Sequence, residues 1–256
     1  MQTISLIATA IVELTKRRPG LLDNMHGRAR WIARTHGKRY DLASIKTYDH
    51  YLRQIYNLVD GLFDGEISQD DFIDGMAEII PAQLTKAWNE GMRENGLDPE
   101  GDMLEEWQLE LDGVILSEFD FVDGFAAAIV DEANKDDPTL DAMHARADLW
   151  AHRYNDVYNL AKLLTSEGTQ KFKWSLGGTE EHCWICQALD GIVAFSREWE
   201  QAGFRPQEPP NDLLSLTNDG EKGCGGWRCD CNLEPTNERR TVRALDRLLD
   251  IAQGVV

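Results

Sequence analysis

All five cysteines of this 256-residue chain lie close together near its C-terminal end. They form two groups, a CWIC segment with Cys183 and Cys186 and a CGGWRCDC segment with Cys224, Cys229 and Cys231. Thiolates are soft metal ligands, and two thiolates separated by two residues can bind one ion from a single tight turn. A Zn²⁺ ion takes four such ligands in a tetrahedron, so one ion shared by both groups would close the long loop between them.

The two cysteine groups therefore predict a structural zinc site. The expected ligands are Cys183, Cys186, Cys229 and Cys231. Because five thiols exceed the four that zinc needs, Cys224 is the substitute for one of them, and His182 is a further candidate ligand. The surrounding segment is rich in turns and has few aliphatic runs, so a bound metal would compensate for a small hydrophobic core.

Two other uses of the thiols stay open. Disulfide bonds would also hold this segment together, although the odd number of cysteines and the lack of a recognisable secretion signal speak against them. A redox role for the CWIC segment would need a strand–helix–strand context of the thioredoxin kind, which the surrounding sequence does not show.

The chain shows no set of residues that we would assign to catalysis. It contains no H-E-x-x-H segment, no G-x-S-x-G nucleophile segment and no Walker-type glycine loop. No histidine is followed by x-Glu, as a zinc deaminase requires. None follows His182, which removes the downstream metal-binding histidine of an HNH-type nuclease. We therefore expect a protein that is not an enzyme.

The formal net charge of −19 is unevenly distributed along the chain. Residues 1–53 hold 10 Lys and Arg against 4 Asp and Glu, whereas residues 54–143 hold 3 against 24. The acidic middle segment repels phosphate, so we expect at most weak, non-specific contact with DNA. That contact would use the basic ends of the chain, which are the N-terminal arm and a stripe of Arg239, Arg243 and Arg247.

Apolar residues recur at helical spacing over most of the first two thirds of the chain. The segment TYDHYLRQIYNLVDGLF predicts one helix, and Ser68 is the expected N-cap of the next, with Asp71 as its capping-box partner. Pro81 lies inside this second helix and predicts a kink or a break there. Beyond the loop ENGLDPEG we expect a long helix or a helix pair, and after KDDP a further helix that runs to about Leu164.

The pattern changes after Gly168, where shorter elements are expected. KFKWSL predicts a strand, and a turn at Asp190 and Gly191 followed by an apolar run predicts a short hairpin. A C-terminal helix is expected to begin at Thr236, its N-cap, and to end near Gly254.

These elements predict a mainly α fold with two domains. Residues 1–167 would form an acidic helical bundle, and residues 168–256 a small zinc-stabilised α+β module that ends in a helix.

The composition, with 42% hydrophobic and 28% charged residues, excludes a collagen-like or largely disordered chain. No segment approaches about 18 uninterrupted apolar residues, so we expect no contact with a membrane. The N-terminal segment has the spacing of an amphipathic helix, and we do not expect it to be a targeting signal.

The cysteine-rich segment resembles the C-terminal signature of the phage minor head proteins, the head morphogenesis family. In TEEHCWICQALDG, a variable loop and CGGWRCDCNLEP, the chain has the threonine, the Asp-Gly pair, the closing cysteines and the proline of that signature. The matching positions are Thr179, Asp190, Gly191, Cys229, Cys231 and Pro235. The chain has GGW where the family usually has His-Pro. With the upstream helical segments, the resemblance covers roughly residues 54–235.

This resemblance implies a virion component. Such a protein would be made in the host cytoplasm, lie in few copies inside the head near the portal, and act in head assembly or DNA delivery. Its partners would be the portal or other head proteins, and its thiols would be reduced and able to bind zinc. The alternative is a non-enzymatic, zinc-containing adaptor that binds a host or regulatory protein or nucleic acid. A third reading is an enzyme, such as a toxin attached to a head-protein module.

Overall fold

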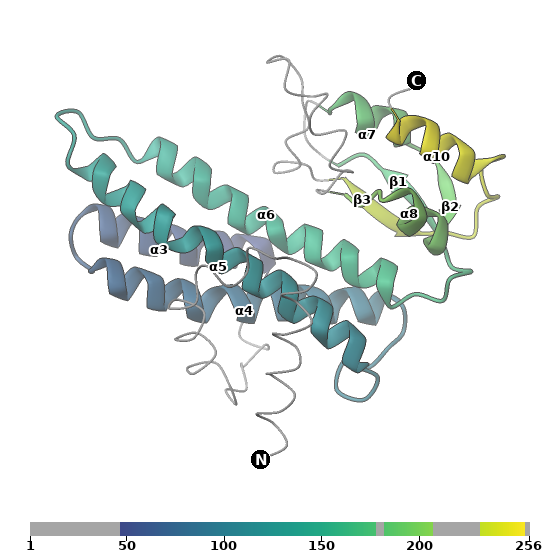
Figure 1. Cartoon of the computed structure of the whole chain (residues 1–256), viewed down its shortest axis with the longest axis horizontal. Coiled ribbons are helices and arrows are strands. Elements are labelled where there is room, and N and C mark those ends of the chain that lie inside the picture. The colour runs from purple at the N-terminus through teal and green to yellow at the C-terminus, as the bar shows by residue number, and fades with distance from the viewer. Residues whose placement is uncertain (1–46, 178–181, 207–230, 254–256) are drawn as a thin grey trace. The chain divides into compact units, whose positions relative to one another are not determined.

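The computed structural model describes residues 47–177, 182–206 and 231–253 (Figure 1). Within these ranges, seven helices and three strands form a mainly helical fold with one small sheet. The mainly α prediction is thereby confirmed, while the stabilisation of the C-terminal part by zinc stays a prediction. The four long helices are α3 (Thr47–Phe63), α4 (Gln69–Glu94), α5 (Glu105–Ala133) and α6 (Asp141–Leu164).

Helix α4 begins where the sequence predicts. Ser68 Oγ accepts a hydrogen bond from the backbone nitrogen of Asp71 (3.2 Å), and Asp71 Oδ2 accepts one from the backbone nitrogen of Ser68 (3.1 Å). This reciprocal pair is a capping box. The helix continues past Pro81 to Glu94, so the alternative of a break at the proline is wrong. Ile80 and Leu84, on either side of Pro81, are fully buried, and this packing outweighs the missing backbone hydrogen bond.

Contacts divide the chain into two compact units. The first comprises Met1–Gln83 and Met103–His144, and the second comprises Leu84–Asp102 and Ala145–Val256. Helices α4 and α6 therefore each contribute residues to both units. The domain boundary that the composition predicts after residue 167 differs from this division and stays a prediction.

The core of the first unit is built from α3, the first part of α4, and α5. Tyr51 and Ile55 of α3, Phe72 of α4 and Phe125 of α5 are fully buried. The rings of Phe72 and Phe125 pack edge to face, with their centroids 5.7 Å apart. The apolar residues that recur at helical spacing in the sequence are thus the residues that join these helices.

The second unit contains an antiparallel sheet with the strand order β2-β1-β3. Its strands are β1 (Lys171–Ser175), β2 (Val193–Phe195) and β3 (Asn232–Pro235). Strand β1 confirms the strand predicted for KFKWSL. Trp174 of β1 is buried and packs against Trp199 of the short helix α8 (Ser196–Ala202), with ring centroids 5.7 Å apart.

The turn at Asp190 and Gly191 does not form the predicted hairpin. It connects the short helix α7 (Trp184–Leu189) to β2, and β2 pairs with β1. The apolar run after the turn is therefore a strand, as expected, but its partner precedes α7 in the chain. Local turn residues indicate where the chain reverses, and they do not specify which segment a strand pairs with.

The C-terminal helix is shorter than predicted. Helix α10 spans Ala244–Ala252 and does not begin at Thr236. Thr236 Oγ1 instead accepts a hydrogen bond from the backbone nitrogen of Glu238 (3.1 Å), so it caps a local turn. Arg239 and Arg243 precede α10, so Arg239, Arg243 and Arg247 do not form the predicted stripe on one helix.

None of the described helices is long and apolar enough to cross a membrane.

Candidate functional site

The CWIC segment forms a tight knuckle at the start of α7. Cys183 is the N-cap of this helix, and its Sγ accepts a hydrogen bond from the backbone nitrogen of Cys186 at 3.3 Å. Cys186 is buried, whereas Cys183 is partly exposed. The two thiols therefore come from one turn, as the C-x-x-C spacing predicts.

Cys231 directly precedes β3 and is buried in the same hydrophobic core as Cys186. Its Sγ is 3.8 Å from Nδ1 of His182, which directly precedes the knuckle. Cys183 packs against this core as well. The structure thus gathers one member of the second cysteine group with both members of the first, and it adds His182.

The complete predicted ligand set is not described. Cys224 and Cys229 lie outside the described residues. Among the residues that the structure does describe, no group of three or more His, Cys, Asp or Glu side chains has an arrangement that would hold a metal ion. The zinc site of Cys183, Cys186, Cys229 and Cys231 therefore stays a prediction.

The segment after Cys231 is held by two buried polar side chains of α6. The backbone nitrogen of Leu233 donates to Asn159 Oδ1 at 3.3 Å, and Lys162 Nζ donates to the carbonyl oxygen of Leu233. Lys162 Nζ also donates to Asn232 Oδ1 at 3.1 Å. Asn159 and Lys162 are each only 1% exposed. These contacts hold the backbone of Leu233 and the side chain of Asn232, the two residues that follow the cysteine.

Burial changes the pKa of Lys162. The loss of hydration of the charged form lowers this pKa to about 8. The negative charges of Glu94 and Glu234 act in the opposite direction and favour the charged lysine. Nothing in the sequence around Lys162 indicated that it would be buried, since it lies in a helix with many polar residues. Its partners Asn232 and Leu233 are about 70 positions away in the chain.

The Asp-Gly turn connects the cysteine knuckle to the sheet. The backbone nitrogen of Asp190 donates to the carbonyl of Cys186 (3.0 Å), and that of Gly191 donates to the carbonyl of Trp174 in β1 (3.0 Å). Gly191 has a φ of 73°, in the left-handed region that favours glycine. A glycine at this position thus allows α7 to end and the chain to enter β2.

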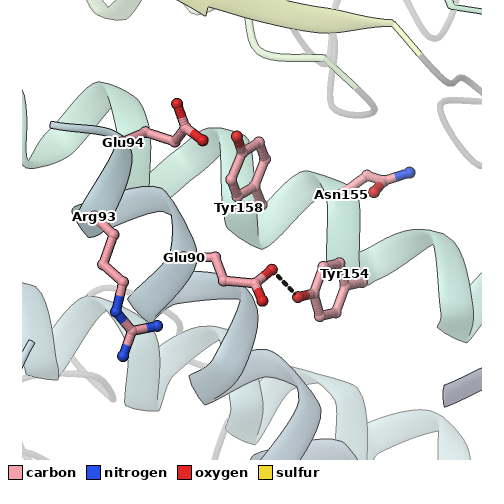
Figure 2. A pocket seen from close by; sticks show the side chains of 6 residues that line it. All are labelled: Glu90, Arg93, Glu94, Tyr154, Asn155 and Tyr158. Carbon is pink, nitrogen blue, oxygen red and sulfur yellow. Dashed lines mark hydrogen bonds between the residues drawn. The ribbon is translucent and has the colours of Figure 1, made fainter. Parts of the chain in front are cut away.

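A second feature, which sequence reasoning missed, is a pocket between parts of α4 and α6 (Figure 2). Its volume is about 400 Å³, and all of its lining residues belong to the second contact unit. We call it the acid–tyrosine pocket. Its lining residues are Glu90, Arg93, Glu94, Tyr154, Asn155 and Tyr158.

Two glutamate–tyrosine pairs form most of this pocket. The hydroxyl of Tyr154 donates a hydrogen bond to Glu90 Oε2, as Figure 2 shows. Burial, this hydrogen bond and the charge of Glu90 raise the pKa of Tyr154 well above its usual value. Burial, followed by the charge of Glu94 and a hydrogen bond to it, raises the pKa of Tyr158 in the same way. Both phenols therefore keep their protons at neutral pH.

The two helices approach closely beside the pocket. A Cβ atom at Gly91 would lie 2.5 Å from the carbonyl oxygen of Tyr158 and 2.7 Å from Cβ of Ala161. Glu90 and Glu94 on one helix, like Tyr154 and Tyr158 on the other, are four residues apart, so each pair of side chains shares a helix face. Such spacings are common in helices, and it is the packing of α4 on α6, close at Gly91, that brings the glutamates and tyrosines together.

No protein-family model, curated protein or solved structure shows a significant match to this chain.

Proposed function

We propose that this chain is a phage minor head protein that acts near the portal in capsid assembly or DNA delivery. One observation carries the proposal beyond the sequence resemblance. The two separated halves of the cysteine signature both lie beside the same residue of β1. Gly191 donates its backbone N–H to the carbonyl of Trp174, and Leu233 lies opposite Trp174 in the β1–β3 pairing.

The residues of the signature therefore have a shared structural role in one small folded unit. Leu189 and Cys186 of α7 and Cys231 before β3 are buried in one core, and Gly191 has the backbone conformation that the turn needs. Pro235 ends β3, which lies at an edge of the sheet, where a residue without an N–H is tolerated. A signature made of such residues specifies a module and requires no catalytic group, which supports a structural role.

A structural zinc ion fits the donors of this module. Cys183 and Cys186 offer two soft ligands from one turn, and Cys231 shares their core. Cys229 would complete the set of four, with Cys224 or His182 as substitutes. When bound, zinc supplies no reaction here and serves only to tie the two halves of the signature together.

The acidic middle of the chain supports a protein partner rather than DNA. Residues 54–143 hold 3 basic against 24 acidic residues, a charge that attracts basic protein surfaces and repels phosphate. In the head protein that we propose, this segment would dock on basic patches of the portal. Binding to DNA would be weak and strongly dependent on salt.

Two measurements test the proposed function. Mass spectrometry of purified virions should detect the chain at a small fraction of the amount of the major capsid protein. Co-expression with the portal gene of the same phage should yield a complex that high salt weakens. A chain that is absent from virions but abundant in infected cytoplasm would favour the adaptor. Tight, sequence-specific DNA binding in an anisotropy titration would favour a nucleic-acid adaptor.

A further inference from the structure

We propose that the acid–tyrosine pocket binds an arginine side chain of a partner protein. The inference does not depend on the proposed role in the phage head. It rests on the hydrogen-bonding character of the pocket, its charge and its aromatic walls.

The two glutamate–tyrosine pairs offer hydrogen-bond acceptors. The proton of the Tyr154 hydroxyl is donated to Glu90, and Tyr158 lies close enough to Glu94 for that carboxylate to raise its pKa. A carboxylate has only acceptor sites, and a phenol whose proton is donated elsewhere has only its oxygen lone pairs left. A group that binds the two carboxylates and the Tyr154 oxygen must therefore bring its own donors, as a guanidinium does.

Of the two other lining residues, Arg93 adds a positive charge that acts on Tyr154, and Asn155 is uncharged. Figure 2 shows the guanidinium of Arg93 extending away from both tyrosines, and the amide of Asn155 pointing away from the glutamates. Both carboxylates are also accessible, because Glu94 is exposed and the side chain of Glu90 is 40% exposed. Lys86 Nζ is 3.7 Å from Glu90 Oε1, a separation that leaves room for a closer donor.

The tyrosine rings provide the second element of recognition. Lys162 Nζ lies 4.7 Å from the centroid of the Tyr158 ring, so one face of this ring is occupied by a cation of the fold and a ligand would have to use the rest of the ring. Arginine suits the pocket better than lysine does. Its planar guanidinium has five N–H donors, stacks on aromatic rings and bonds carboxylates in a two-pronged manner. A cavity of about 400 Å³ is large enough to admit such a side chain.

A titration with blocked amino acids tests the proposal on the whole chain. The probe is N-acetyl-arginine N-methylamide, and its uncharged control is the citrulline analogue, which has nearly the same shape. With carbon-13-labelled tyrosine, the 6 tyrosines of the chain give few NMR signals, which Tyr154→Phe and Tyr158→Phe assign. We expect saturable shifts at these two residues only, with a dissociation constant on the order of 1 mM for such a small ligand.

Matched variants separate the pocket from the general negative charge. Glu90→Gln with Glu94→Gln should weaken binding by about fivefold, since two exposed ion pairs are lost. The control pair is Glu106→Gln with Glu110→Gln, which removes the same charge at the same spacing from an exposed part of α5. It should leave the affinity unchanged.

Three outcomes would overturn the inference. These are the absence of saturable shifts at Tyr154 and Tyr158, equal binding of the citrulline analogue, and equal weakening by the control pair. Equal affinity for the lysine analogue would overturn the assignment to arginine. Unchanged NMR spectra away from the substituted positions establish that the variants are folded.

Discussion

The side chain of Lys162 donates a hydrogen bond to the backbone carbonyl of Leu233, about 70 positions later in the chain. Lys162 is almost completely buried, and its ammonium group also donates to Asn232 Oδ1 at 3.1 Å. Together with Asn159, it holds β3 directly after Cys231. The position of the last cysteine of the signature thus depends on a helix outside the signature.

This buried lysine predicts a characteristic dependence of stability on pH. Burial lowers the pKa of Lys162 from 10.5 to about 8, so between these values the unfolded chain binds more protons than the folded chain. The stability contribution of Lys162 should therefore rise with pH over this window, by up to about 3 kcal/mol. Urea unfolding of wild type and Lys162→Met from pH 7 to 10.5 measures it. Parallel pH profiles of the two proteins would contradict the prediction.

A second prediction concerns the fully buried carboxylate of Asp156. It accepts hydrogen bonds from Arg153 Nη1 (2.5 Å) and from Arg205 Nε (2.7 Å). Asp156→Ala would leave both arginines, which are mostly buried, without this partner, and should lower the free energy of unfolding by about 2–4 kcal/mol. Asp246→Ala is the matched control, because it removes an aspartate from the exposed pair with Arg243. Urea denaturation should show a loss for the first variant and no measurable change for the second.

A third prediction follows from the close approach at Gly91. In Gly91→Ala, the new Cβ would overlap the backbone of Tyr158 and Cβ of Ala161, so the two helix segments must separate. We expect a loss of about 1–3 kcal/mol, as for other overpacked positions. In Gly124→Ala the added Cβ meets nothing within 4 Å, and the higher helix propensity of alanine should stabilise the chain slightly. Equal melting temperatures of the two variants would argue against the close helix packing.

Features whose causes are local could be predicted from the sequence. The start of α4 follows from Ser68 and Asp71, which are three residues apart and bond to each other. The buried faces of α3 and α5 follow from the spacing of their apolar residues. The knuckle of Cys183 and Cys186 follows in the same way, because a two-residue spacing already sets its geometry.

Features that depend on distant contacts could not be predicted. Thr236 has the residue type of a helix N-cap, but nothing nearby in the sequence shows that it caps a turn and that α10 begins only at Ala244. The partner of β2 was missed because a strand's local pattern does not name its neighbour. The acid–tyrosine pocket was missed because its four principal residues come from two helices, and nothing local in the sequence shows that these helices pack closely at Gly91.

The last prediction concerns the metal. Reduced, purified protein should contain about one zinc ion per chain by elemental analysis, bound by four thiolates. Cys183→Ser is an informative variant, because serine is itself a good N-cap and can keep the start of α7 while it removes a soft ligand. Cys183→Ser and Cys229→Ser should both lose the metal, whereas Cys224→Ser should retain it.

Two other outcomes would change this assignment. Loss of zinc in His182→Ala would add the histidine to the ligand set, since its Nδ1 lies 3.8 Å from Sγ of Cys231. Metal-free protein with a quantified disulfide between Cys183 and Cys186 would show that the thiols serve a different purpose.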